Sequence, residues 1–409
     1  MSETRTSGGA TPPPSAQAVT AGVGSGDRPG PGNRPRLGVL DFSPIQYHTP
    51  LYQLITRRVR VELDVLFLTD SGYRPFVAPG FGVAVTWDID LLSGYECQFM
   101  TTSGRCPSAV SRVARLARWV ADHDAVVVHG YSHPWMLIAA LLCRMRRVPY
   151  LLRGDSIPQA KATGLRRHLR NAVVRTVVSA SAAGLAIGRL NEDFYRYYGA
   201  RRVIWAPYSV DDERFAGPPR TSRSELLSRW KLDDDKPVIL FCGKLSPWKR
   251  PLDLCAAVKA LGHDVNVLFV GDGVLADEVR ACLPPGTGAV TGFVNQSELP
   301  AYYHAADIIV LPSEVENWGL VINEAMAAGV LPVVSDHVGA APDLVVGVGE
   351  VYPCGDTARL ADALRRALVV ANNPETRNTV RQHVARYCLS RTATGFEEAV
   401  FAVSDSLCD

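Results

Sequence analysis

Short apolar runs rich in Val, Ile and Leu alternate with longer amphipathic stretches from Arg36 onward. This alternation is typical of parallel βα units, in which a helix follows each buried strand and covers the sheet. We expect strands at 36–41, 61–68, 124–130, 149–154, 183–188 and 203–207 in the first half, and at 237–243, 265–271, 288–292, 307–312, 331–335 and 349–352 in the second. Helices of the second half should begin near Trp248, Leu275, Ser297, Gly319 and Thr357. The pattern predicts an α/β fold with two doubly wound parallel sheets.

A chain of 409 residues is longer than one hydrophobic core usually supports. A polar stretch with Pro218 and Pro219 interrupts the alternation and marks the connection between two domains. We predict a disordered tail over 1–35, a first domain over 36–207, a second domain over 208–390 and a C-terminal helix over 391–409. The tail is rich in Pro, Gly, Ser and Thr and lacks the apolar segment of a secretory signal.

The composition is that of an ordinary globular protein, with 47% apolar and 21% charged residues. The nine cysteines are scattered and form no C-x-x-C pair, which favours buried thiols in a reducing cytoplasm. The most apolar window, 125–143, is interrupted by His and Pro and is too short to span a bilayer. We see no clustered metal ligands and expect neither a metal nor a nucleic-acid partner.

The small net charge of +2 hides a strong polarity. Residues 36–200 hold 20 Lys and Arg against 12 Asp and Glu, whereas residues 201–409 hold 20 against 27. A helix over 108–121 should carry one apolar stripe of Val110, Val113, Ala117 and Val120. The basic residues of interest are Arg112, Arg115 and Arg118 opposite that stripe, and Arg144, Arg146, Arg147, Arg166, Arg167 and Arg170 elsewhere in the same domain. Such charge predicts peripheral contact with an anionic membrane, and a solvated basic face is the alternative.

Ligands of open parallel sheets bind beyond the carboxyl ends of the strands. Unusual residues of the second half each follow a predicted strand: Lys244, Asp272, Phe293, Glu316 and Asp336. We therefore expect a binding site along this edge.

The segment FCGKLSPWKRP places two lysines beside a predicted helix start. Ser246 suits the cap of that helix and Pro247 its first position. A helix N-terminus attracts anions, and Lys244 and Lys249 would add positive charge there. A diphosphate fits this arrangement, and two solvated lysines beside a capped helix are the alternative.

The segment PSEVENWGLVINEAMAAG carries Glu316 and Glu324. If a helix begins near Asn317, Glu324 lies opposite its apolar stripe and Glu316 lies in the preceding loop. The free amides at this helix start belong to Trp318, Gly319, Leu320 and Val321. One carboxylate could bind sugar hydroxyls and the other a ribose, with phosphates on the amides between them. Solvated surface is the alternative for both glutamates.

The segment VGDGVLADEV matches the dinucleotide fingerprint at Gly271, Gly273 and Ala276, which makes a nicotinamide-dependent oxidoreductase a rival interpretation. The fingerprint expects an acidic residue at the end of the next strand, and GAVTGFVN has none. A small-residue turn that admits a ligand explains the segment better, and a purely structural turn remains open.

Taken together, G-K-L-S-P-W-K, G-D-G, G-F-V and the long P-S-E-V-E-N-W-G segment resemble the retaining GT-B glycosyltransferases of family 4, over Pro207 to Pro353. The resemblance implies two Rossmann-like domains facing across a cleft. It implies transfer of a sugar, with retention of configuration, from a nucleoside-diphosphate sugar to a glycan, lipid-linked or small-molecule acceptor. Polysaccharide biosynthesis in the cytoplasm, in part at the membrane, is the matching role.

The resemblance also implies a role for each residue of the site. Lys244 and Lys249 would hold the pyrophosphate, Glu316 the donor-sugar hydroxyls and Glu324 the ribose. The remaining donor contacts would be Gly273, which makes room for the donor, and Phe293 with Val294 against the nucleobase. No cofactor is implied, because the nucleotide sugar is a co-substrate.

The first domain departs from the family pattern. The first predicted strand is followed by DFSPIQYHTPLYQL, which has no glycine pair. Many members carry a histidine where this chain has YLLRGDS, so Asp155 is our candidate on the acceptor side. We interpret His129 and His133 as structural. A GT-B protein that only binds carbohydrate is therefore a further alternative to the enzyme.

Overall fold

The computed structural model describes residues 34–404, apart from 74–75, 78–83, 103–107, 159–164 and 263. Residues 1–33 of the predicted tail lie outside this range. Among the described residues, none of the helices combines the length and apolar character needed to cross a bilayer.

The first sheet is wholly parallel and has the strand order β5-β2-β1-β6-β7-β8-β9. Its strands are β1 (Arg36–Asp41), β2 (Glu62–Phe67), β5 (Glu96–Phe99), β6 (Ala125–His129), β7 (Tyr150–Arg153), β8 (Ala183–Ala186) and β9 (Val203–Trp205). A separate two-stranded antiparallel sheet consists of β3 (Phe76–Val77) and β4 (Ala84–Val85).

The second sheet is also wholly parallel, in the order β12-β11-β10-β13-β14-β15. Its strands are β10 (Val238–Cys242), β11 (Asn266–Val270), β12 (Gly288–Val290), β13 (Ile308–Leu311), β14 (Leu331–Ser335) and β15 (Glu350–Tyr352). The prediction of two doubly wound parallel sheets is confirmed. In each sheet the first strand, β1 or β10, lies inside, and later strands extend the sheet on both sides of it.

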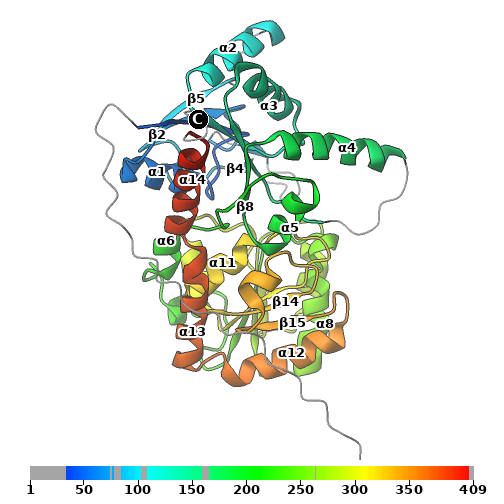
Figure 1. The fold of residues 1–409 in the computed structure, drawn as a ribbon. Coiled ribbons are helices and arrows are strands. Elements are labelled where there is room, and N and C mark those ends of the chain that lie inside the picture. Colours follow the sequence, from blue (N-terminus) through cyan, green and yellow to red (C-terminus); the bar gives the residue numbers. More distant parts are fainter. Residues whose placement is uncertain are drawn as a thin grey trace, which may run out of the picture.

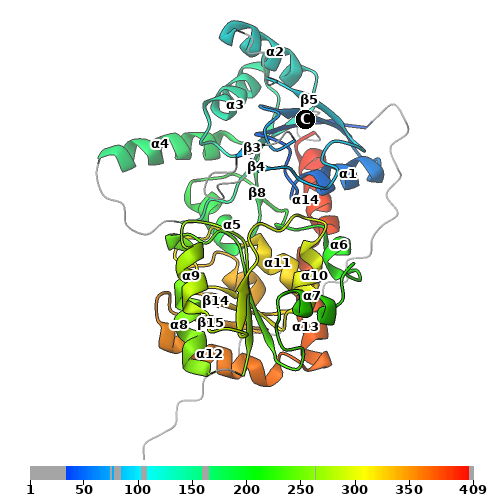
Figure 2. The same ribbon diagram turned by 180° about the vertical axis from the view of Figure 1, so that it is seen from behind.

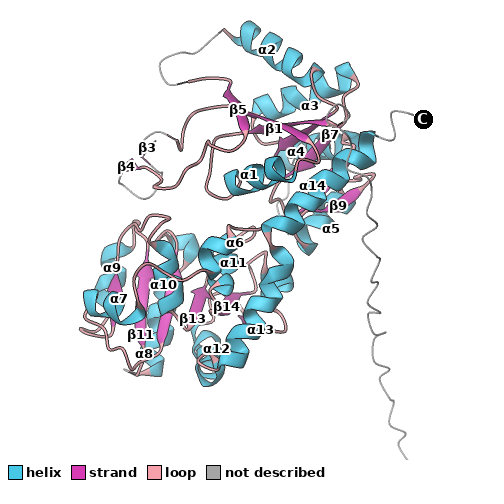
Figure 3. Ribbon diagram, turned by 90° about the vertical axis from the view of Figure 1, so that its left-hand side faces the viewer, coloured by secondary structure: helices cyan, strands magenta, loops and turns pink. Residues whose placement is uncertain are grey.

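Helices cover both sheets, and each sheet with its helices forms one domain. The two domains lie one above the other in Figure 1, and Figure 2 shows them from behind. Those of the first half are α1 (Thr49–Arg58), α2 (Ala109–Ala121), α3 (Pro134–Arg146), α4 (Leu165–Ala180), α5 (Arg189–Tyr197), α6 (Asp212–Ala216) and α7 (Arg223–Arg229). Those of the second half are α8 (Pro251–Leu261), α9 (Ala276–Cys282), α10 (Leu299–Ala305), α11 (Leu320–Ala327), α12 (Thr357–Val370), α13 (Pro374–Val384) and α14 (Leu389–Ser404). Figure 3 shows the strands of each domain enclosed by helices.

The last helix, α14, returns from the second domain and packs on the first (Figure 1). Its buried face includes Phe396 and Val400, which join the core formed by Tyr52 and Ile55 of α1. The guanidinium of Arg153 lies 5.1 Å from the centroid of the Phe396 ring. The C-terminal helix therefore completes the core of the first domain.

Two features of the first domain differ from the sequence prediction. Strand β5 was not expected, because its residues ECQF carry no run of branched apolar side chains and are only partly buried. The predicted stripe of α2 is wrong in part: Val110 is 80% exposed, whereas Leu116 and Trp119 are buried. The reason is that Leu116 and Trp119 join the core formed by Leu40 of β1, Leu66 of β2 and Met100.

The basic face of α2 is also narrower than predicted. Arg115 donates to the carbonyl of Phe99 at 2.8 Å and to the amide oxygen of Gln98 at 2.9 Å. The guanidinium of Arg112 lies 4.7 Å from the centroid of the Trp135 ring. These two cations hold β5 and α3 in place, so they are weaker candidates for lipid contact than the sequence suggests.

We predict that Phe396→Ala lowers the free energy of unfolding by about 3–5 kcal/mol, because it leaves a cavity between α14 and α1. Urea denaturation measures this loss. The matched control is Glu398→Ala on the exposed side of the same helix, which should change stability by less than about 0.5 kcal/mol. Equal effects of the two substitutions would contradict the packing of α14 described here.

Candidate functional site

A cavity of about 590 Å³ lies between the carboxyl ends of the two sheets. Most of the residues selected from the sequence line it: Asp155, Lys244, Lys249, Phe293, Val294, Glu316, Trp318, Gly319, Leu320, Val321 and Glu324. Asp272 and Asp336 also follow strands, but their carboxylates accept from the amides of Gly273 and Cys354, each at 2.8 Å, and do not line the cavity. The strand-end rule thus brings together residues that are up to 169 positions apart, from Asp155 to Glu324.

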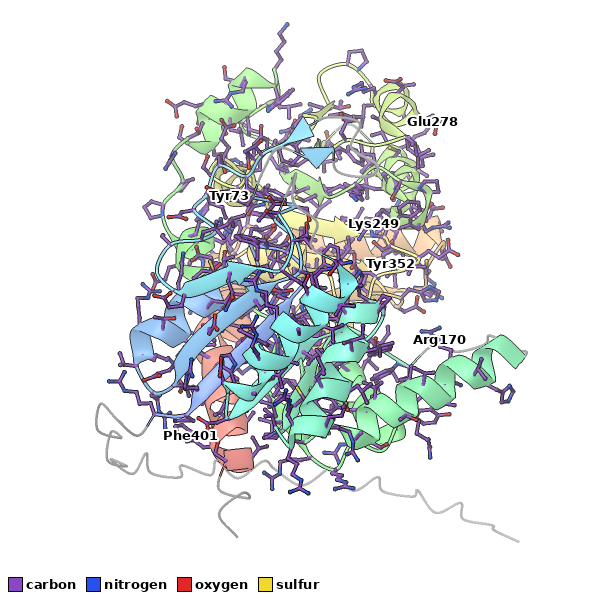
Figure 4. All side chains as sticks on the ribbon, turned by 90° about the horizontal axis from the view of Figure 1, so that it is seen from above. Tyr73, Arg170, Lys249, Glu278, Tyr352 and Phe401 are labelled. Carbon is purple, nitrogen blue, oxygen red and sulfur yellow. The ribbon has the colours of Figure 1, made fainter. Side chains whose placement is uncertain are left out.

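An ion pair joins the two charged segments of the second domain. The ammonium of Lys249 donates to the carboxylate of Glu316, and both side chains are mostly buried, with 21% and 16% of their surfaces exposed. Lys244 lines the same cavity. Figure 4 shows Lys249 near the middle of the molecule in the view from above.

The prediction that Ser246 caps an α-helix with Pro247 at its first position is wrong. Pro247–Lys249 form a single 3₁₀ turn, the Ser246 hydroxyl makes no cap bond, and α8 begins only at Pro251. The physical reason is Pro251, which disfavours helical geometry at the preceding residue, and Arg250 takes the left-handed conformation with φ of 52°. Lys249 therefore approaches the cavity from a tight turn and not from the first turn of an α-helix.

Helix α11 directs its N-terminus at the cavity. It begins at Leu320, next to the start expected near Gly319 and three residues after Asn317. Gly319 precedes it with φ of +99°, a conformation that favours glycine, and a Cβ there would lie 2.8 Å from the Leu311 side chain. The amides of Leu320 and Val321 have no partner inside the helix and are available to an anion in the cavity, whereas the amide of Ile322 donates to the carbonyl of Gly319 at 2.8 Å.

The side chain of Trp318 has a structural role that the sequence did not indicate. The indole is 4% exposed and donates to the Asn323 side chain at 2.9 Å. A Cβ on Gly188 of the first domain would lie 2.1 Å from the Trp318 ring. The ring thus packs directly against first-domain backbone, two residues before α11 begins.

Glu324 lies in the cavity wall but is fully buried. One carboxylate oxygen accepts from the Tyr303 hydroxyl at 2.5 Å, and the other has no hydrogen-bond partner among the described residues. Burial raises the pKa of Glu324 to about 7, although Tyr303, Arg214 and Tyr47 act in the opposite direction. An unsatisfied buried carboxylate oxygen next to a cavity is an acceptor for a ligand hydroxyl.

Gly273 does not line the cavity, whereas Gly271 does. A Cβ on Gly273 would lie 2.5 Å from the carbonyl oxygen of Leu245, and one on Gly271 would lie 1.9 Å from that of Gly243. Both glycines allow the loop after β11 to pack on the loop after β10. Gly273 therefore has a role in loop packing, and its contact with a donor stays a prediction.

A first-domain loop contributes Trp87 to the wall of the cavity. Trp87 lies with its ring centroid 6.1 Å from that of Phe293, and both line the cavity together with Val294. The loop is held by the second domain, since Asn295 donates to the carbonyl of Thr86 at 2.7 Å. No sequence pattern pointed to Trp87, because its segment lies between predicted elements.

The first domain contributes a buried cluster that the sequence analysis missed. Asp41 ends β1, His129 ends β6, and His48 precedes α1 and lines the cavity. Asp41 accepts from the His48 ring at 2.7 Å and from the Tyr52 hydroxyl at 2.8 Å. The expectation of no clustered metal ligands is wrong, because ligand atoms of Asp41, His48 and His129 lie within 4.8 Å of one another. The signal was present, since β1 and β6 are neighbouring parallel strands.

The protein environment lowers the pKa values of both Asp41 and His129 in this cluster. Burial would raise the pKa of Asp41, but His48, His129 and the hydrogen bonds from His48 and Tyr52 outweigh it and hold the pKa well below its usual range. Burial lowers the pKa of His129 to about 3. At neutral pH the cluster therefore holds an ionised Asp41 beside a neutral His129. His133 has a local role instead, because its ring accepts from the amide of Trp135 at the start of α3.

The two facing parallel-sheet domains with a cavity between their carboxyl edges define a GT-B fold. The solved structure of HepE from Anabaena in complex with UDP superposes with a TM-score of 0.69 at 17% identity, over 90% of this chain and all of that one. A Rickettsia africae glycosyltransferase superposes with a TM-score of 0.68 at 13% identity, over 91% of this chain and 99% of that one.

Sequence comparisons assign the family. The profile of the glycosyl transferases group 1 matches residues 222–385. A 2-deoxystreptamine glucosyltransferase of Streptomyces kanamyceticus is 30% identical over 61% of this chain and 69% of its own length. The sulfoquinovosyl transferase of Arabidopsis thaliana is 26% identical over 68% of this chain, which spans 56% of that relative. The chain belongs to the glycosyl transferases group 1 family.

We predict a pH-dependent stability difference between the wild-type protein and Glu324→Gln. Because the pKa of Glu324 is higher in the folded than in the unfolded state, ionisation costs stability as pH rises through about 7. Between pH 5 and pH 8 the wild type should lose roughly 2–3 kcal/mol of unfolding free energy relative to the variant. Urea denaturation at the two pH values checks this, with Glu278→Gln at an exposed position as control (Figure 4). A constant difference across this range would contradict the burial of an ionisable Glu324.

Proposed function

We propose that the protein transfers a glycosyl group from a nucleoside-diphosphate sugar to an acceptor hydroxyl, with retention of anomeric configuration. The observation that carries the proposal is the convergence of Lys244, the Lys249–Glu316 pair and the N-terminus of α11 on one cavity. Two cations and a row of amides suit a diphosphate, and a carboxylate beside them suits sugar hydroxyls.

We infer one orientation of the donor in the cavity. The diphosphate lies between Lys244, Lys249 and the first-turn amides of α11, and Glu316 exchanges its bond with Lys249 for bonds to sugar hydroxyls. The unpartnered oxygen of Glu324 accepts from the ribose. The nucleobase lies at the end lined by Phe293, Val294 and Trp87. Relatives named for GDP-mannose and a structural neighbour solved with UDP support a nucleotide sugar of either base.

The reaction breaks the bond between the sugar C1 and a phosphate oxygen, which keeps the electron pair. The acceptor oxygen bonds to C1 on the same face, and its proton moves to the departing phosphate oxygen. Positive charge from the lysines and amides stabilises the leaving diphosphate. Asp155, at the first-domain side of the cavity, orients the acceptor hydroxyl.

The oxidoreductase alternative loses its main support. Gly271 and Gly273 of the fingerprint pack the loop after β11 against the loop after β10. The residues after β12, Thr291, Gly292 and Phe293, provide no acidic side chain for an adenosine ribose. The non-catalytic alternative predicts a different result in a turnover assay. Such a protein would bind a nucleotide sugar and release no nucleoside diphosphate.

We predict that Lys249→Ala weakens binding of UDP or GDP, whichever the wild type binds more tightly, by about 1.5–3 kcal/mol, because one charge-assisted contact to the diphosphate is lost. Isothermal titration calorimetry gives the affinity. Lys259→Ala, on the exposed face of α8, is the control and should bind as the wild type does. If the Lys249 variant keeps full affinity, the diphosphate binds elsewhere.

We predict the opposite profile for Glu316→Gln. The variant should bind the nucleoside diphosphate at least as tightly as the wild type, because Lys249 no longer has a carboxylate partner. Its turnover, measured as nucleoside diphosphate released from the preferred nucleotide sugar, should fall by about 100-fold or more. Near-normal turnover would remove Glu316 from the mechanism.

A further inference from the structure

A second pocket, of about 730 Å³, adjoins the donor cavity in the first domain. The two share Asp155 in their linings. The second pocket has an aromatic wall, since the rings of Tyr131 and Phe194 are stacked at 6.2 Å with an interplanar angle of 4°. It also has hydroxyl and amide groups, because Tyr131 bonds to the Ser156 hydroxyl at 2.8 Å and Tyr198 donates to the Asn171 side chain at 3.0 Å.

A mostly apolar groove of about 430 Å³ continues from this pocket between α3 and α4. Leu169 and Val173 of α4 line both the pocket and the groove. The groove leaves large apolar side chains open to solvent: Leu141 is 59% exposed, Leu169 70% and Val173 46%. Exposed apolar side chains gathered in one groove mark a binding surface, whereas scattered ones do not. Figure 4 shows α4, with Arg170 labelled, extending away from the body of the molecule.

The far end of the groove is strongly basic. Arg144 lines the groove and also a neighbouring pocket that includes Arg147, Arg201 and Arg202. No Asp or Glu is among the described residues that line this neighbouring pocket. A path therefore runs from the donor cavity through polar and aromatic groups, then over apolar side chains, to a cluster of cations. This order suits an amphiphile whose hydroxylated head group lies in the polar pocket and whose apolar chain lies in the groove. The cations beyond the groove suit anionic lipid head groups of the surrounding membrane.

We propose that the acceptor is an amphiphile, with a sugar or polyol head group in the Tyr131–Asp155 pocket and a single alkyl or prenyl chain in the groove between α3 and α4. The inference rests on the proposed function, because it takes the donor cavity as the place of transfer. The hydroxyls of the head group bond to Asp155, Ser156 and Asn171. The alkyl or prenyl chain covers the side chains of Leu141, Leu169 and Val173, which the fold otherwise leaves exposed to water.

The test measures how affinity depends on chain length. The full-length protein is titrated by calorimetry with methyl, hexyl, octyl and decyl β-D-glucopyranoside, each below its critical micelle concentration. Burial of an added methylene should raise affinity by about two- to fourfold. In the double variant Leu141→Gln, Val173→Gln this dependence should disappear. Val369→Gln, which replaces an 83% exposed valine on α12, is the control and should keep it.

Three results would overturn the proposal. One is the same affinity for methyl and decyl glucoside in the wild type, and another is an unchanged chain-length dependence in the double variant. The third is a wild-type dimer, measured by light scattering, that the double variant converts to a monomer, because the groove would then be an interface between two copies of this chain.

Titration of the same preparations with UDP and GDP separates this inference from the proposed function. Nucleotide binding without a chain-length effect would overturn the amphiphilic acceptor and leave the donor site intact. A chain-length effect without binding of either nucleotide would overturn the donor site, and with it the assignment of the amphiphile as an acceptor.

Discussion

The parallel direction of every strand in the two large sheets is the constraint on which the site depends. Parallel strands all end at the same edge, so the loops after β10, β11, β12 and β13 meet there without any contact being encoded between them in sequence. The first sheet turns its own carboxyl edge, with Asp41, His129 and Asp155, toward the same space. Packing of Trp318 on Gly188 and the return of α14 to the first domain hold the two edges face to face.

This constraint also explains how much could be predicted from the sequence. Buried strands of a parallel sheet are almost continuously apolar, so runs such as VILFC and NVLFV identified their strands. The edge strand ECQF was missed because its residues are exposed or only partly buried and form no continuous apolar run. The start of α8 was misplaced, since Pro251 sets backbone geometry at Arg250 that apolar periodicity does not encode.

Among the site residues, the sequence located at the cavity those whose chemical type follows a strand, such as Lys244 and Glu316, and it did not indicate features that tertiary contacts decide. Burial of Glu324 against Tyr303, the contact of Gly273 with Leu245 and the approach of Trp87 to Phe293 all join segments far apart in sequence. The cluster of Asp41, His48 and His129 was open to prediction from strand order, which is itself a tertiary property.

Hydrogen–deuterium exchange with and without saturating UDP or GDP tests the central claim most directly, because it reports on the backbone amides themselves. A diphosphate on the N-terminus of α11 should slow exchange in peptides covering 318–321 and, through Lys244 and Lys249, in those covering 243–249. Peptides of the opposite end of the second sheet should be unchanged. Saturating nucleotide that slows exchange elsewhere but leaves 318–321 unprotected would contradict the donor site described here.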